Sequence, residues 1–114
     1  MKLDEFLDTL KSAPESIEFS DTMAVIENGY EFTETAFKNG GTDNAAGQNN
    51  GSCKLFAFAQ LNSLSEEETL ACFGAYYRDE VLGDPEGDSH QNIRNFMNSG
   101  WSGIQFEGTA LSIK

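Results

Sequence analysis

The stretch that decides the fold is Cys53-Lys-Leu-Phe-Ala-Phe-Ala-Gln-Leu61, which is apolar almost all round. Periodicity alone does not separate a buried helix from a buried strand in so short a run. Its two alanines, Gln60 and Leu61 favour a helix, and Ser52 is a suitable N-cap. We therefore expect a central, buried helix around which the rest of the chain packs.

Two helices are expected on the N-terminal side of this stretch. The first is amphipathic and ends at Pro14, because apolar residues recur at helical spacing at Leu3, Phe6, Leu7 and Leu10. The second begins near Ser20 or Asp21, which are both good N-caps. It ends at Asn28-Gly29, where Gly29 can adopt the left-handed conformation that often closes a helix.

Two more helices are expected on the C-terminal side. Ser65 and Glu68 have the spacing of a capping box, and they begin a helix that ends at Gly83. Its apolar stripe consists of Leu70, Phe73, Gly74, Tyr77 and Val81. A last helix begins at Asp88 or Ser89 and stops at Gly100, burying Ile93, Phe96 and Met97.

Short alternating segments predict a small sheet. They run from Tyr30 to about Lys38, from Ile104 to Phe106, and over 110–113, which can pair back on 104–106. Residues 39–52 hold four Gly and four Asn and predict a flexible loop. The expected fold is one α+β domain over 1–114, mainly helical with about five helices and a small antiparallel sheet.

The charge narrows the range of partners. The chain has 114 residues and a formal net charge of −12. A phosphate backbone attracts clustered Lys and Arg, so we expect no nucleic-acid binding. Anionic membrane surfaces are disfavoured on the same ground. Acidic residues concentrate in 1–37 and 65–88, which we interpret as solvated helix faces.

The two cysteines, Cys53 and Cys72, are expected to be reduced thiols of a protein made in the cytoplasm. Both lie in apolar stretches, so packing is the favoured role. A Cys53 nucleophile with His90 as its base is the alternative, although nothing in their spacing brings them together. The patterns therefore favour a non-catalytic protein, and no cofactor is expected.

The candidate binding residues lie on the polar side of the last helix and on the helix before it. His90 and Arg94 are one helical turn apart, as are Gln91 and Asn95. Imidazole, guanidinium and amide groups can recognise a small polar ligand or a partner by hydrogen bonding. The alternative is a solvated face, or an ion pair between Arg94 and a neighbouring acid. Tyr76 is expected at the rim, with Tyr77 in the core.

The acidic turn before this helix has the composition of a cation loop but not its pattern. Asp84, Glu86, Asp88 and His90 occupy alternate positions. A calcium-binding EF-hand loop starting at Asp84 requires Gly at its sixth position and Glu at its twelfth, where this chain has Ser89 and Asn95. We therefore predict no metal site.

Three motifs, in order along the chain, resemble the HopJ family of bacterial type III effectors. They are Gly51-Ser-Cys-Lys-Leu-Phe-Ala-Phe-Ala-Gln-Leu61, Cys72-Phe-Gly-Ala-Tyr-Tyr-Arg-Asp-Glu-Val-Leu82, and His90-Gln-Asn-Ile-Arg-Asn-Phe-Met-Asn-Ser-Gly-Trp-Ser-Gly-Ile104. The likeness extends from about Leu3 to Leu111. It implies an association with type III secretion, but no catalytic residue defines the family, so none is carried over.

Two functional hypotheses follow from the resemblance and the residues together. The first is a non-catalytic effector that is secreted into a host cell and binds an unknown host or bacterial protein through His90, Arg94 and Asn95. The second is a resident cytoplasmic domain that binds a small polar ligand, or catalyses an unrecognised reaction, at the same place.

Overall fold

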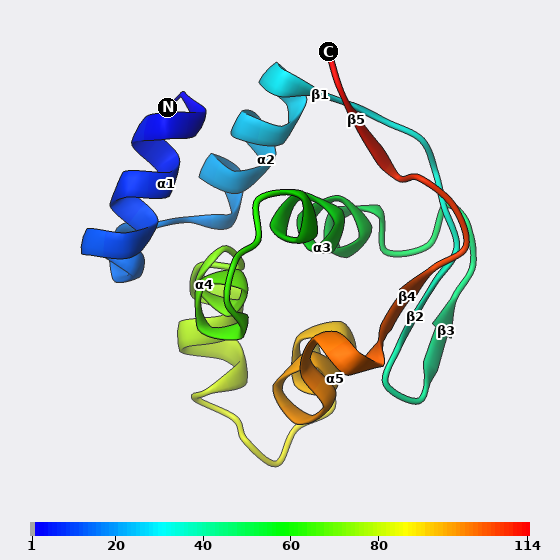
Figure 1. Ribbon diagram of the computed structural model, residues 1–114. Coiled ribbons are helices and arrows are strands. Elements are labelled where there is room, and N and C mark those ends of the chain that lie inside the picture. Colours follow the sequence, from blue (N-terminus) through cyan, green and yellow to red (C-terminus); the bar gives the residue numbers. More distant parts are fainter. Residues whose placement is uncertain (1) are drawn as a thin grey trace.

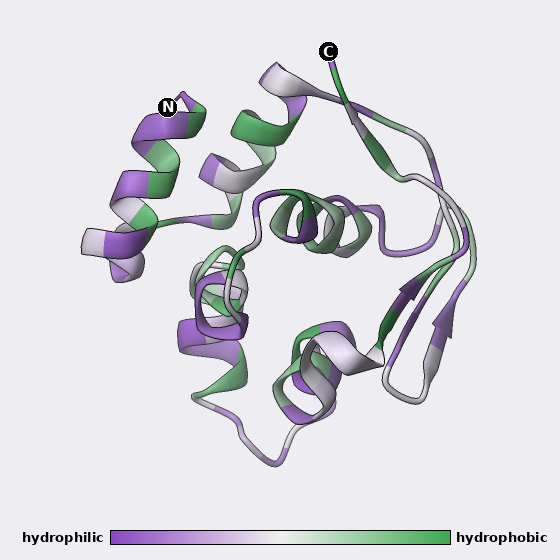
Figure 2. Cartoon of the chain, in the orientation of Figure 1, coloured by the Kyte–Doolittle hydropathy of each residue, from purple (hydrophilic) through white to green (hydrophobic). Residues whose placement is uncertain are grey.

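The computed structural model describes residues 2–114. Figure 1 shows helix α3 (Asn50–Leu61) at the centre of a ring of shorter elements. Residues 55–59 of this helix are all buried, at most 7% exposed. Figure 2 shows the same helix largely in the colours of apolar residues. The predicted central helix is thus confirmed, and the apolar core forms around it.

Five α-helices occur within residues 2–114, as predicted. In chain order, the α-helices and the shorter 3-10 (η1, η3) and π (η2) helices are α1 (Leu3–Ser12), η1 (Pro14–Ser16), α2 (Phe19–Gly29), α3, α4 (Glu66–Ala71), η2 (Tyr76–Val81), α5 (Gln91–Ser99) and η3 (Gly100–Gly103). The capping box is confirmed. The Glu68 backbone N–H donates to Ser65 Oγ at 3.1 Å, and the Ser65 N–H donates to Glu68 Oε1 at 2.9 Å.

The predicted single helix from Ser65 to Gly83 is wrong, because the chain breaks at Gly74. Gly74 has φ +62°, and a Cβ placed there would lie 2.7 Å from the backbone nitrogen of Phe19. Only glycine allows both the left-handed conformation and this close approach. The break separates α4 from η2, which begins at Tyr76.

Several predicted helix ends are also corrected. Helix α2 begins at Phe19 rather than at Ser20 or Asp21, because Glu18 and Asp21 form its capping box. Gly29 is its last residue and has no positive φ. Helix α5 begins at Gln91, after His90 rather than at Asp88 or Ser89. On α5, the predicted core residue Met97 is 43% exposed.

The strands form two small antiparallel sheets. Strands β1 (Tyr30–Phe32) and β5 (Leu111–Ile113) form one, and β2 (Phe37–Asn39), β3 (Thr42–Asn44) and β4 (Ile104–Phe106) form the other in the order β3-β2-β4. The predicted pairing of 110–113 with 104–106 is therefore wrong. The register places Leu111 opposite Phe32. The α+β class with a small antiparallel component is confirmed.

The sequence predicted one flexible loop over residues 39–52, but the structure contains regular elements there. Its first part completes the β2–β3 hairpin, and its last residues form the first turn of α3. Asn39 is fully buried and Asn44 is 3% exposed. The composition misleads here because Asn39 and Asn44 are held in the core by hydrogen bonds with Asn92.

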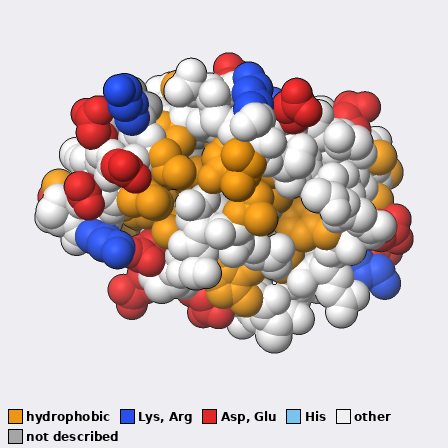
Figure 3. Space-filling view, turned by 45° about the horizontal axis from the view of Figure 1, so that its top comes forward, with side chains coloured by type: hydrophobic (Ala, Val, Ile, Leu, Met, Phe, Trp, Pro, Cys, Tyr) orange, Lys and Arg blue, Asp and Glu red, His pale blue; other side chains and the backbone are white. Residues whose placement is uncertain are grey.

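The surface combines charged and apolar areas. In the face shown in Figure 3, apolar side chains form a band across the middle, and charged side chains lie mostly towards its margins. Within residues 2–114, no helix is long and apolar enough to cross a membrane.

Candidate functional site

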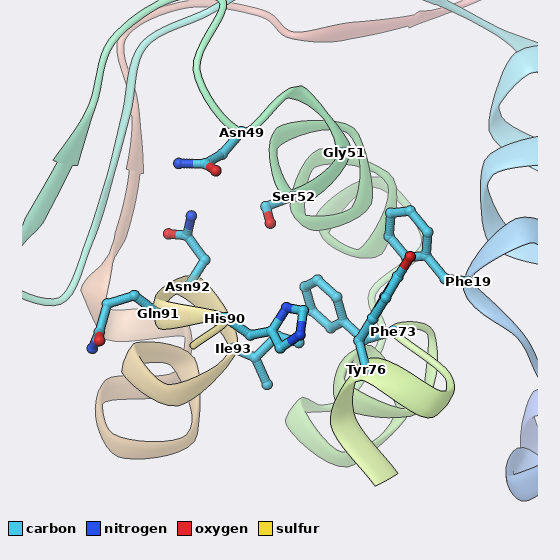
Figure 4. A pocket seen from close by; sticks show the side chains of 10 residues that line it. All are labelled: Phe19, Asn49, Gly51, Ser52, Phe73, Tyr76, His90, Gln91, Asn92 and Ile93. Carbon is cyan, nitrogen blue, oxygen red and sulfur yellow. The ribbon is translucent and has the colours of Figure 1, made fainter. Parts of the chain in front are cut away.

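A pocket of about 330 Å³ lies where the first turns of α3 and α5 meet η2 and the start of α2. We call it the α3–α5 pocket. Figure 4 shows its side chains, with amides on one side and aromatic rings on the other. Its lining residues are Phe19, Asn49, Gly51, Ser52, Phe73, Tyr76, His90, Gln91, Asn92 and Ile93.

Both helices enter the pocket from a residue in the left-handed conformation. Asn49 precedes α3 with φ 52°, and His90 precedes α5 with φ 52°. Neither helix has a side-chain cap, although the first N–H groups of a helix have no partner inside it. These helix ends therefore present hydrogen-bond donors, and the positive end of each helix dipole, on the same side of the protein.

Four aromatic residues line one side of the pocket. Phe19 stacks on Phe73 with ring centroids 6.2 Å apart, and Tyr76 meets Phe19 edge to face at 5.3 Å. The Tyr76 ring also lies 5.1 Å from the His90 imidazole. Tyr76 is thus held between two rings although it is 41% exposed.

The close packing at this aromatic side depends on Gly51. A Cβ placed there would lie 3.0 Å from Phe19 Cζ, so any side chain would have to displace the Phe19 ring. The imidazole of His90 is held in place by Glu80, since His90 Nε2 lies 3.0 Å from Glu80 Oε1. Glu80 lies one turn after Tyr76 in η2, so this short helix anchors both rings at the rim.

A network of asparagines supports the polar side. Asn39 Nδ2 donates to the backbone oxygen of Asn92 at 2.8 Å and to its Oδ1 at 3.0 Å. Asn92 Nδ2 donates in turn to Asn44 Oδ1 at 3.2 Å. Asn49 Nδ2 donates to that same oxygen at 2.7 Å. The network joins the β2–β3 hairpin to the first turns of both helices.

Of the five residues predicted from the sequence, the structure brings Tyr76, His90 and Gln91 to the α3–α5 pocket. Arg94 and Asn95 lie outside it. In Figure 4 the Gln91 side chain points away from the pocket, and its Nε2 donates to Asn95 Oδ1 at 2.8 Å.

Arg94 and Asn95 both hold other parts of the chain. Arg94 Nε donates to the Ser89 backbone oxygen at 2.6 Å, and its Nη1 donates to that of Asp84 at 2.8 Å. Arg94 therefore fixes the acidic turn through backbone oxygens, instead of pairing with a neighbouring acid. Asn95 Nδ2 donates to the Asn39 backbone oxygen at 3.0 Å and to Thr42 Oγ1 at 2.8 Å.

Sequence reasoning missed Phe19, Asn49, Ser52 and Asn92 as pocket residues. For Asn49 and Ser52, the signal that could have found them is the asparagine-rich segment 39–52 itself. We interpreted it as a flexible loop, whereas several of its amides bond to one another and to α5. The proximity of Phe19 depends on the chain break at Gly74, which has no local sequence signal beyond the glycine.

The two cysteines are buried, free thiols. Burial raises the pKa of Cys53, and its Sγ lies 3.5 Å from the Thr35 backbone oxygen. Burial likewise raises the pKa of Cys72 to about 12. Both shifts oppose the thiolate that a nucleophile requires. Within residues 2–114, no group of three or more His, Cys, Asp or Glu side chains is placed to hold a metal ion.

Comparison with known proteins bears on the family and the fold. The family model described as HopJ type III effector protein matches residues 3–111. A solved structure, titled as that of the unknown function protein VPA0580, is 62% identical in sequence with a TM-score of 0.98. That match covers 100% of this chain and 95% of the other. A search of curated proteins found no match.

The class that fold and site define is a small α+β domain with an aromatic and amide-lined pocket. The chain belongs to the HopJ type III effector protein family, which confirms the resemblance carried by its three sequence motifs.

Proposed function

We propose that this HopJ-family protein acts by non-catalytic binding, and that the α3–α5 pocket is its site for a small polar ligand. One observation carries the proposal: two uncapped helix starts and four aromatic residues surround one cavity of about 330 Å³. Ligand pockets in proteins begin at about this size. The Ser52 hydroxyl points into the cavity and makes no hydrogen bond to another residue in 2–114.

Of the predicted binding residues, Tyr76 and His90 would contact the ligand in this proposal. Arg94 and Asn95 would act indirectly, since their contacts hold the acidic turn and the hairpin beside the pocket. The mixture of free polar groups and ring surface suits a ligand with one apolar part and one hydrogen-bonding part.

The test is a melting-temperature screen against a library of metabolites and divalent ions. Only binding to the native state raises the midpoint, and a ligand at 100 times its Kd contributes about 2.7 kcal/mol. We expect a compound that raises the midpoint of the wild type and of Leu82→Ala by several degrees but leaves that of Tyr76→Ala unchanged. Leu82 is a matched control because it is exposed and outside the pocket.

Two results would contradict the proposal. One is a screen in which no compound raises the midpoint. The other is a compound that shifts Tyr76→Ala as much as the wild type, each measured against its own ligand-free midpoint, because binding would then not involve the aromatic side.

A second candidate function, favoured by membership of a type III effector family, is action on a protein partner. The chain would be made in the bacterial cytoplasm, exported through a type III apparatus, and bind a host protein at the rim formed by Tyr76, His90 and Gln91. The test follows tagged protein in culture supernatants with and without a working apparatus. Apparatus-dependent export supports this candidate, and retention beside an exported control protein contradicts it.

A further inference from the structure

We propose that the α3–α5 pocket takes a flat, uncharged heteroaromatic ring that carries a hydrogen-bond donor and an acceptor side by side on one edge, as nucleobases and cyclic amides do. The inference rests on the proposed function and specifies its ligand class. It is argued from the aromatic side, from the two unused polar groups, and from the charge of the lining.

The aromatic side is already arranged for stacking. Tyr76 is 41% exposed at the rim, yet it makes ring contacts with both Phe19 and His90. Its position is therefore set before any ligand arrives, which lowers the entropy cost of binding. Aromatic rings favour offset-stacked or edge-to-face neighbours at 4.5–7 Å between centroids. A flat ring gains these contacts, whereas a sugar or an aliphatic chain does not.

The polar side offers one acceptor and one hydroxyl, carried by residues three positions apart at the start of α3. Asn49 Nδ2 is occupied by Asn44 Oδ1 at 2.7 Å, and this bond fixes which way the amide faces. Figure 4 shows Asn49 Oδ1 on the side nearer Ser52, with the Ser52 hydroxyl pointing into the pocket. Asn49 Oδ1 can accept from a ring N–H, while the Ser52 hydroxyl can donate to a ring carbonyl. Together they match a donor–acceptor edge.

The charge of the lining favours an uncharged ring. No Asp, Glu, Lys or Arg is among the ten lining residues. A cationic ligand would have no carboxylate to pair with inside the pocket. An anionic ligand would gain about two- to fivefold in affinity from each helix start, but it would be opposed by the field of a chain with net charge −12. An uncharged ring carries neither penalty.

The experiment measures binding by saturation-transfer NMR with uracil as the probe. Three controls are benzene rings without the paired edge of uracil: benzyl alcohol is neutral, benzamidine is cationic and benzoate is anionic. Erythritol, a small polyol, tests for a non-aromatic ligand. We expect uracil to bind with a Kd below about 1 mM, the range of a fragment-sized ligand, and at least tenfold more tightly than each control.

Matched variants locate the binding. Tyr76→Ala should weaken uracil binding at least tenfold, whereas Tyr76→Phe, which keeps the ring, should stay within about threefold of the wild type. Ser52→Ala should weaken it by about tenfold, the cost of one lost hydrogen bond. Ser112→Ala is its control, because Ser112 is exposed on β5 outside the pocket.

The results separate this inference from the proposed function. If erythritol, benzoate or benzamidine binds at least as tightly as uracil and Tyr76→Ala abolishes that binding, the pocket is a ligand site but the ring class is wrong. If uracil binds equally well to Tyr76→Ala and Ser52→Ala, or does not bind, the inference is overturned. The proposed function fails on a different result: no compound of the metabolite screen raises the melting midpoint of the wild type more than that of Tyr76→Ala.

Discussion

Asn39, on the middle strand of the three-stranded sheet, is joined to Asn92, in the first turn of α5, by two hydrogen bonds of 2.8 and 3.0 Å from one amide nitrogen. Both residues are buried. This pair attaches the β2–β3 hairpin to the helix whose start forms one edge of the α3–α5 pocket. The position of the pocket therefore depends on amide contacts inside the core as well as on apolar packing.

The first prediction concerns this network. Asn92→Ala should lower the free energy of unfolding by about 1–3 kcal/mol, because it removes the side-chain hydrogen bonds that Asn92 makes with the buried amides of Asn39 and Asn44 and leaves Asn39 Nδ2 only the backbone oxygen of residue 92. Asn98→Ala, on the exposed part of the same helix, should cost less than about 0.5 kcal/mol. Urea denaturation measures both. Equal, small losses would mean that the network contributes nothing to stability.

The second prediction concerns the break between α4 and η2. Gly74→Ala should lower the free energy of unfolding by more than about 2 kcal/mol, because it combines a strained φ of +62° with a Cβ 2.7 Å from the Phe19 backbone. Gly29→Ala is the matched control. It has open space around it and no positive φ, so it should stabilise the protein by about 0.4–1 kcal/mol. Thermal or urea unfolding that ranks the two in the opposite order would refute the explanation.

The third prediction follows from the buried thiol of Cys72. Its pKa rises from an ordinary value of 9.0 to about 12 on folding, so the folded state retains a proton that the unfolded state loses. The stability from this group is complete below about pH 9 and is lost as the pH rises further, by about 1.4 kcal/mol per pH unit. Cys72→Ala should flatten the decline in the free energy of unfolding between pH 9 and 11, relative to the wild type. Parallel curves for the two proteins would show that the thiol does not contribute.

The fourth prediction concerns the acidic turn held by Arg94. Lysine cannot reproduce the guanidinium contacts with Ser89 and Asp84. In Arg94→Lys, a glutamate-specific protease should cleave faster after Glu86, while cleavage after Glu107 in the same digest stays unchanged. Equal rates of cleavage after Glu86 in variant and wild type would mean that Arg94 does not order the turn.

The sequence was sufficient to predict a helix where the residues of that helix alone determine it. The apolar run at 53–61 predicted the buried helix, and Ser65 with Glu68 predicted the start of α4. It was insufficient where the structure depends on contacts between distant segments. Gly74 breaks a helix because Phe19 approaches its backbone, which no local pattern encodes. Met97 has the spacing of a core residue, but Asn92 is buried instead, because amides from the hairpin satisfy it.

The candidate site shows the same limit. Tyr76, His90 and Gln91 could be singled out by residue type and helical spacing. Arg94 and Asn95 have equally suitable chemistry, yet their bonds run to the acidic turn and to the hairpin. Residue type alone does not separate a group available to a ligand from one that supports its neighbours. Only the hydrogen-bond partners seen in the structure distinguish these two kinds of group.

The central claim, that the α3–α5 pocket is the ligand site, is tested most directly by mapping binding onto assigned backbone amides. The compound with the largest melting shift in the metabolite screen would be titrated into ¹⁵N-labelled protein and followed by ¹H–¹⁵N NMR. The account predicts that the largest shifts occur at Gly51, Ser52, Gln91 and Asn92, and that they vanish in Tyr76→Ala. Largest shifts in α1 or in the β1–β5 sheet, with the pocket amides unmoved, would contradict it.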